Sequence, residues 1–119
     1  MATIEERLHE LGIKLPTGKA PGGNYITACQ WQGIVYVAGH GSFDVETGEP
    51  VTGKVGIDLT VEQGYEAARL AGLWCLGTLK DYLGDLDRVA RILKVTGFVN
   101  ASPGFTEHPK VINGCSDLL

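Results

Sequence analysis

The sequence predicts one α+β domain of 119 residues. Two observations indicate this fold class. Short runs rich in β-branched and aromatic residues are separated by turn-forming residues, as in strands, and the apolar residues of segment 61–83 recur at helical spacing. A chain of this length suffices for one domain and is too short for two. We therefore expect a sheet with a long helix packed on it.

The N-terminal residues 1–24 are expected to form a helix followed by a turn-rich extension. Thr3 can cap this helix, and Glu6 stands at the capping-box position. An apolar stripe follows from Ile4, Leu8 and Leu11. Residues 16–23 are dominated by proline and glycine and predict a connector without regular structure. The main domain is then 25–119.

Four strands are expected in the main domain. Residues 25–31 and 34–39 predict a hairpin, because the two residues between them, Gln32 and Gly33, suit a tight turn. The second of these strands is apolar on both faces, which is typical of a central strand covered on both sides. Alternating residues at 54–59 predict a third strand, and the β-branched segment 89–99 predicts a fourth.

Two helices complete the predicted domain. The first spans 61–83, with Thr60 and Gln63 in a capping-box pattern before it and Gly84 at its C-cap. The second opens at 106–109 and carries its apolar side to the last residues, Leu118 and Leu119. Because it has no C-cap and no polar tail, we expect the sequence to be cut within this helix or a partner chain to cover its end.

Composition narrows the function classes. Ten basic and 14 acidic residues give a net charge of −4, and the basic residues are scattered, so we expect no nucleic acid partner. No apolar run reaches the roughly 20 residues that cross a bilayer, and the N-terminus lacks the apolar centre of a secretory signal. We expect a cytoplasmic protein without a membrane partner. Cys29, Cys75 and Cys115 form no C-x-x-C pair, which argues against disulfides and structural zinc.

The histidines do not by themselves indicate a reaction. His9, His40 and His108 lack the spacing of a metal site, so no metal is expected. The stretch 39–42, Gly-His-Gly-Ser, lacks the lysine and following helix of a phosphate loop. His40, Ser42 and Asp44 are the residue types of a hydrolytic triad, but such close neighbours on an extended segment rarely point at one another. Composition and spacing therefore lead no further than a soluble α+β domain.

Five short motifs, in order, resemble the RidA/YjgF family. They are Tyr25-Ile-Thr-Ala28, Val35-Tyr-Val-Ala-Gly-His40, Phe43-Asp-Val-Glu-Thr-Gly-Glu49, the strand-like segment 89–99 and the stretch from Phe105 to Asn113. The resemblance implies a chorismate-mutase-like fold: a mixed sheet with one long helix and a second helix on one face, three subunits, and pockets at their interfaces. It also implies that the domain at 25–119 is incomplete at its C-terminus.

The activity implied by the resemblance is hydrolysis of reactive 2-imino and enamine acids to 2-oxo acids and ammonia, without metal or cofactor. By position, Tyr25 and Asn113 match pocket residues of the family. Ala38, Gly39 and His40 stand where the family carries Ser-Gly-Gln, so a hydroxyl is missing and a glutamine is replaced. We expect these five residues to bind substrate.

The catalytic residue remains unassigned. The family holds the substrate carboxylate with an arginine on C-terminal strands that this chain lacks, and Arg69, Arg88 and Arg91 do not replace it by position. We therefore expect a hydrolase in the full-length form and a weak or inactive 119-residue chain.

The departures at Ala38 and His40 leave open a non-catalytic, trimeric module that binds small ligands. A further alternative is endoribonuclease activity, which is also attributed to the family, although the acidic charge counts against it. The expected partners are small 2-imino and 2-oxo acids and further copies of the chain in a homotrimer.

Overall fold

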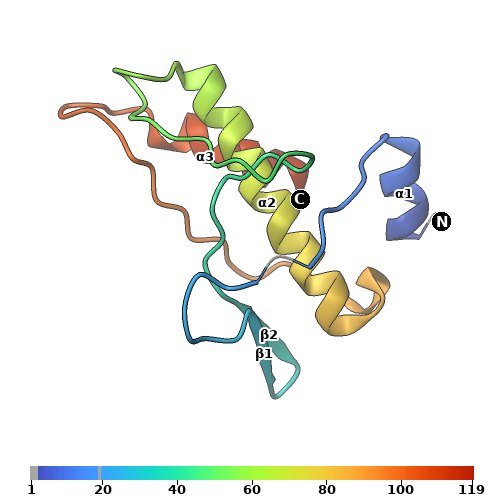
Figure 1. The fold of residues 1–119 in the computed structure, drawn as a ribbon. Helices are drawn as coiled ribbons and strands as arrows, with labels where there is room; N and C mark the ends of the chain where they lie inside the picture. The colour runs from blue at the N-terminus through green and yellow to red at the C-terminus, as the bar shows by residue number, and fades with distance from the viewer. Residues whose placement is uncertain (1–2, 19) are drawn as a thin grey trace.

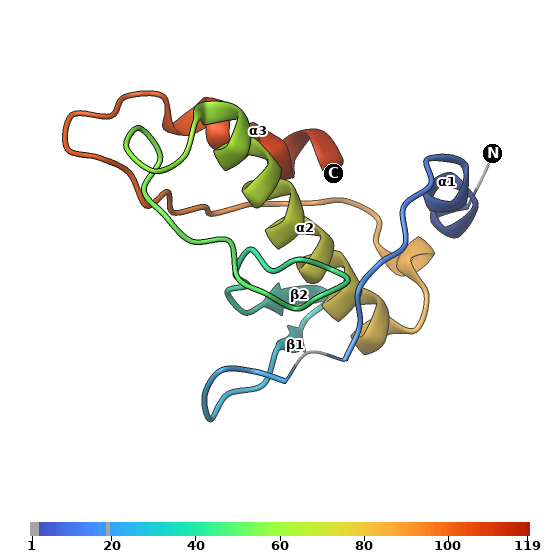
Figure 2. The same ribbon diagram turned by 45° about the horizontal axis from the view of Figure 1, so that its top comes forward.

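The long helix α2 (Val61–Leu83) is the element against which the others pack (Figure 1). The structure is a computed structural model and describes residues 3–18 and 20–119. Its other elements are α1 (Ile4–Glu10), β1 (Ala28–Trp31), β2 (Ile34–Val37), the short 3₁₀ helix η1 (Leu86–Arg88) and α3 (His108–Leu118). Figure 2 shows the hairpin near the C-terminal half of α2 and α3 beside its N-terminal half. The α+β fold class is confirmed.

Local capping fixes both ends of α2 where the sequence predicts them. The Thr60 hydroxyl accepts a hydrogen bond from the Gln63 backbone N–H at 3.1 Å, and the Gln63 side chain accepts one from the Thr60 N–H at 2.8 Å. At the other end Gly84 has a φ of 82°, and its N–H donates to the Lys80 carbonyl. These bonds satisfy backbone groups that a helix end leaves unpaired.

The α2–α3 contact is a close approach between two backbones. Gly114 of α3 lies against the Tyr65 carbonyl of α2, where a Cβ atom would have no room. A Cβ on Gly72 would come within 3.1 Å of the Cys115 sulfur. Helix α3 begins at His108 with a proline in its first turn, close to the predicted start, and no side chain caps it. Small residues therefore set the distance between these helices.

The predicted hairpin is confirmed, with slightly shorter strands. β1 and β2 pair antiparallel, with Ala28 opposite Val37 and Trp31 opposite Ile34. Gln32 and Gly33 both have positive φ, 48° and 79°, as a type I′ turn requires. The expectation that the second strand is covered on both sides is wrong for the described chain. Alternate residues of β2 are exposed, because only one face of this two-stranded sheet lies against α2.

The strands predicted at 54–59 and 89–99 are absent from the described chain, so the sheet has two strands and not the expected mixed arrangement. Val55 makes bridges only, with Leu59 and Ala101, and its backbone bonds to Asn100 and Ser102. Residues 90–98 are all exposed. A β-strand exists only where a neighbouring strand takes up its N–H and C=O groups. Segment 54–59 has such a neighbour only at Val55, and the described residues 90–98 have none.

The N-terminal helix α1 packs at the C-terminal end of α2. Leu8, Leu79 and Leu86 form a buried cluster there. Glu5 pairs with Lys80 at 3.0 Å. The predicted capping box of Thr3 and Glu6 is confirmed. After the helix the chain returns over α2, and the Pro16 carbonyl lies directly on Gly77, a contact that any side chain at position 77 would block.

No helix of the described residues is both long and apolar enough to cross a bilayer.

Replacing Gly114 with alanine tests the close helix contact. Alanine favours an isolated helix over glycine by about 1 kcal/mol, yet here its Cβ would meet the Tyr65 carbonyl. We expect a net loss of about 1–3 kcal/mol in the free energy of unfolding, measured by urea denaturation. Gly22→Ala is the control, because nothing lies within 4 Å of a Cβ at that position. A Gly114→Ala chain as stable as the control would show that the helices do not touch in this way.

Candidate functional site

The imidazole of His40 lies just beyond β2 and is held at both nitrogens. Nδ1 is 2.6 Å from the Ala38 carbonyl oxygen, and Nε2 is 2.7 Å from the Thr78 hydroxyl oxygen. A carbonyl oxygen can only accept, so Nδ1 carries the hydrogen of this bond. In the neutral ring Nε2 is then an acceptor, and the Thr78 hydroxyl donates to it. The bond joins residues 38 positions apart.

A small polar cavity of about 50 Å³ opens beside Thr78. This is roughly the room of one or two water molecules. Its lining combines hydroxyl and carboxylate side chains with the N-terminal connector: Pro16, Thr17, Gly18, Thr27, Trp74, Thr78 and Asp81. The Trp74 indole N–H donates to the Phe43 carbonyl at 2.9 Å, which fixes that wall. The cavity can therefore hold a water molecule against the Thr78 hydroxyl.

The geometry is that of a base, a hydroxyl and an orienting group. The Ala38 carbonyl orients His40, His40 accepts the hydroxyl proton, and Thr78 faces the cavity. This order of contacts is the one that activates hydroxyl nucleophiles and water in hydrolases. The site can thus take a proton from the hydroxyl or from a water bound to it.

The triad of neighbours considered from the sequence does not form. The Asp44 carboxylate accepts hydrogen bonds from the Thr47 and Glu46 backbone N–H groups, both at 2.9 Å. These bonds lower its pKa. Asp44 therefore closes its own turn, and His40 reaches instead to α2.

Ala38 and Gly39 frame His40 without adding side-chain chemistry. The Ala38 N–H donates to the Thr27 carbonyl at 2.9 Å, and its own carbonyl holds the imidazole. Gly39 is exposed, with nothing within 4 Å of a Cβ position. Ala38 therefore takes part through its backbone, where the hydroxyl of the family's serine is missing.

Tyr25 and Asn113 do not join His40 in one cluster. Tyr25 is 48% exposed, and its hydroxyl accepts from the Gly22 N–H at 3.3 Å. Asn113 is exposed on α3, which packs near Arg69 on α2. Arg69 and Thr78 are separated by roughly 14 Å along α2, at 1.5 Å per residue. Asn113 is therefore at a different part of the helix from the Thr78 hydroxyl that binds His40. The substrate-binding roles expected for both residues stay predictions.

Thr78 and Asp81 line the cavity, and neither was predicted from the sequence as a site residue. Thr78 stands in the otherwise apolar run Leu73-Trp-Cys-Leu-Gly-Thr-Leu79. A lone hydroxyl in such a run was a usable signal, because a half-buried polar group needs a partner. Nothing in the local pattern, however, indicated that the partner would be His40.

Cys75 and Cys115 are unsuited to act as nucleophiles. Burial raises the pKa of the Cys75 thiol to about 11, and burial also raises that of Cys115. Both thiols are therefore protonated at neutral pH and pack within the helix pair. Cys29, on β1, is exposed.

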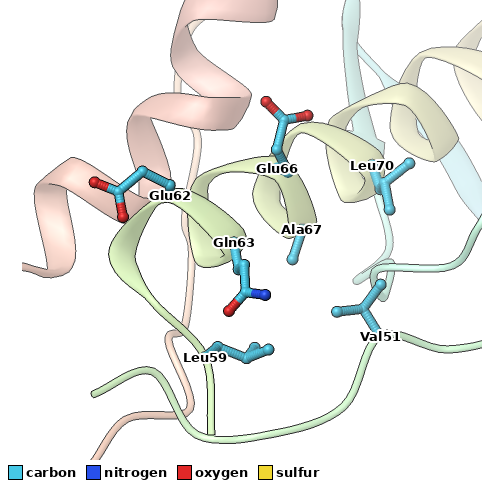
Figure 3. A pocket seen from close by; sticks show the side chains of 7 residues that line it. All are labelled: Val51, Leu59, Glu62, Gln63, Glu66, Ala67 and Leu70. Atoms are coloured by element: carbon cyan, nitrogen blue, oxygen red, sulfur yellow. The ribbon is translucent and has the colours of Figure 1, made fainter. Parts of the chain in front are cut away.

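A larger cavity of about 370 Å³ lies elsewhere, between the N-terminal half of α2 and the loop before it (Figure 3). Its lining is mainly aliphatic and includes no histidine, serine, threonine or cysteine: Val51, Leu59, Glu62, Gln63, Glu66, Ala67 and Leu70. It is the larger space, but it has no hydroxyl or thiol nucleophile, and its titratable groups are the carboxylates of Glu62 and Glu66. We therefore take His40 and Thr78 as the candidate site.

Known proteins resemble the chain along most of its length. A family described as "YjgF/chorismate mutase-like, putative endoribonuclease" matches residues 5–119. Protein TCP17 of Trypanosoma cruzi is 41% identical over 116 residues, which are 98% of this chain and 72% of that protein. A crystal structure from Shewanella oneidensis MR-1, described as a "putative endoribonuclease", superposes with a TM-score of 0.92 at 35% identity. The match covers 98% of this chain and 77% of the other. The crystal structure of protein Atu1372 of Agrobacterium tumefaciens superposes with a TM-score of 0.84 at 39% identity. That match covers 98% of this chain and 69% of the other.

The hydrogen bonds of His40 predict its tautomer. In the neutral ring the proton should be on Nδ1, because that nitrogen faces a carbonyl oxygen. The ¹⁵N chemical shifts of the two ring nitrogens report this directly. Thr78→Val should leave the tautomer unchanged and lower the stability by about 1 kcal/mol, because it removes only the Nε2 partner. A neutral ring protonated on Nε2 would contradict the arrangement.

Proposed function

The chain belongs to the YjgF/chorismate-mutase-like family, and from that premise we propose that it hydrolyses reactive 2-imino and enamine acids to 2-oxo acids and ammonia. The observation that carries the proposal is the His40–Thr78 hydrogen bond beside a cavity of water size. Hydrolysis of an imine needs one positioned water and one proton acceptor. Imines react readily with water, so positioning and base catalysis suffice.

In the proposed reaction the water oxygen attacks the carbon of the protonated imine (C=NH₂⁺), while one water proton passes through the Thr78 hydroxyl to His40 Nε2. The addition gives a carbinolamine, in which carbon carries both the new hydroxyl and the amino group. Protonation of that amino group by the imidazolium allows ammonia to leave. The carbinolamine hydroxyl loses its proton as the C=O bond of the 2-oxo acid forms, the ammonia takes up this proton and leaves as ammonium, and the imidazole is again neutral.

The substrate carboxylate requires a cation that the cavity beside Thr78 does not have. No lysine or arginine is among the described residues that line it. Arg88 lies in η1, just after α2, and its guanidinium donates to the Leu83 carbonyl at 2.9 Å. A missing bidentate partner for the carboxylate removes binding energy and orientation. We therefore expect weak activity from the 119-residue chain.

Endoribonuclease activity is the second candidate. It is favoured by the description of the matching family and of the Shewanella structure. An imidazole next to a hydroxyl could also serve the acid–base steps of RNA cleavage. The net charge of −4 opposes RNA binding, so this function ranks below imine hydrolysis.

We further propose that the active form is a homotrimer in the cytoplasm. Apolar side chains of the unpaired segment lie open to solvent, Phe98 being 94% and Leu93 68% exposed. Trp31 and Tyr36 of the hairpin are also exposed, at 68% and 55%. An apolar surface of this kind marks an interaction site. Neighbouring subunits would also bring further residues toward His40.

The imine assay tests the first proposal. The purified chain is added to a pyridoxal-phosphate dehydratase that releases 2-iminoacids, and the decay of imine absorbance is followed. We expect a weak acceleration that falls about tenfold or more in His40→Gln and Thr78→Val, because the proton acceptor or its relay is lost. Thr52→Val is the matched control, since Thr52 is exposed and outside the cavity. The proposal is overturned if the chain does not accelerate imine decay, or if both variants accelerate it as much as the unmodified chain does. Cleavage of labelled RNA that depends on His40 would replace it with the second candidate.

The proposed trimer has a mass of about 38 kDa, three times the 12.7 kDa of one chain. Light scattering of the purified chain should give this value. Phe98→Glu should shift the mass toward one chain, because it introduces a charge into the apolar surface. A wild-type mass of 12.7 kDa at micromolar concentration would contradict the trimer.

A further inference from the structure

We propose that the groove between α2 and residues 51–59 is a docking site for a segment of a partner protein that carries aliphatic side chains beside lysine or arginine. The groove is the 370 Å³ cavity of Figure 3. This volume is in the range of binding sites for small ligands or short peptide segments. The proposal does not depend on the imine chemistry, because the groove lies along residues 62–70 of α2, at least eight residues before Thr78.

The floor of the groove is aliphatic and its outer wall is held in place. Val51 and Leu59 face Ala67 and Leu70 across the gap (Figure 3). The Val51 N–H donates to the Ser42 carbonyl at 2.8 Å. The Leu59 carbonyl accepts from the Gly56 N–H at 2.8 Å. The wall is thus formed before any partner arrives, which lowers the entropic cost of binding.

A further bond ties the middle of this wall to the rest of the chain. The Asn100 side-chain amide donates to the Gly53 carbonyl at 3.3 Å. Gly53 has a φ of 129°, and a Cβ there would lie 3.0 Å from that of Asp58. The turn therefore keeps the residues on either side of it, Val51 and Leu59, on the side that faces α2.

Gln63 contributes one oriented donor. Its Oε1 accepts the capping-box bond from the Thr60 N–H at 2.8 Å, which fixes the orientation of the amide. The amide nitrogen is then left facing the gap between Leu59 and Val51 (Figure 3). A donor held in this way suits a backbone carbonyl of a docked segment. A purely apolar ligand would leave it unpaired.

The charge of the groove selects a cationic partner. Glu62 and Glu66, one helical turn apart, line its helix side with their carboxylates turned outward from the gap (Figure 3), and no lysine or arginine of the described chain is part of its lining. Neither carboxylate takes part in an ion pair with another described residue. While an aliphatic side chain of the partner occupies the floor, a neighbouring lysine or arginine can extend outward over α2 and place its charge at these carboxylates. Anionic lipids and nucleic acids are repelled by the same pair.

Titration with two labelled peptides tests the inference. The first is a 12-residue peptide of leucine and lysine, and the second carries glutamate in place of each lysine. We expect fluorescence anisotropy to show binding of the basic peptide only. The Glu62→Lys, Glu66→Lys double variant should weaken it about tenfold or more, because attraction becomes repulsion. Ala67→Trp should weaken it as well, because the indole fills the floor.

A matched control separates the groove from general electrostatics. Glu46→Lys with Glu49→Lys changes the net charge by the same amount at exposed positions outside the groove, and should leave the affinity within twofold. In ¹⁵N-labelled chain, shift changes on binding should be confined to residues 51–70. Equal weakening by both double variants, shifts elsewhere, or no binding of the basic peptide at millimolar concentration overturns the proposal. Each readout is independent of imine turnover, so failure here leaves the proposed reaction untouched.

Discussion

Close approach to the backbone of α2 is the constraint on which the rest of the structure depends. Three glycines along this helix remove the side chains that would keep other segments away. Val55 and Val111 lie against Gly64, α3 lies against Gly72, and the Pro16 carbonyl lies against Gly77. Glycine within a helix costs about 1 kcal/mol relative to alanine. The packing gained at each contact offsets that cost.

The contact between the Pro16 carbonyl and Gly77 also shapes the candidate site. Thr78 follows Gly77, so the connector that rests on the glycine also forms one wall of the cavity beside the threonine. On the other side the His40 imidazole is brought to the same hydroxyl by the end of β2. The position of the imidazole is therefore set by the hairpin and that of the cavity wall by the N-terminal extension. Two elements far apart in sequence meet at one helical turn of α2.

The parts of the fold that could be predicted are those that short-range rules decide. The bounds of α2 follow from Thr60, Gln63 and Gly84, and the hairpin follows from Gln32 and Gly33. The segments 54–59 and 89–99 have strand-like sequences, but a strand also needs a neighbour to bond, which local pattern does not reveal. The same distinction holds for the site. The motif that ends at His40 could be found from the sequence, because its residues are neighbours in the chain. The bond from His40 to Thr78 could not, because it joins residues 38 positions apart.

The exposed segment 90–98 has a consequence for the lifetime of the chain. Its backbone makes no hydrogen bond with other backbone groups in the described residues, and its side chains include Ile92, Val95 and Phe98 at 42% exposure or more. Proteases bind their substrates in extended form, so a single chain offers them a ready cleavage site here, between α2 and α3. The same stretch is apolar and has free edges, which favours uncontrolled strand pairing at high concentration. Cellular abundance of the protein would then depend on how quickly each newly made chain has this stretch covered.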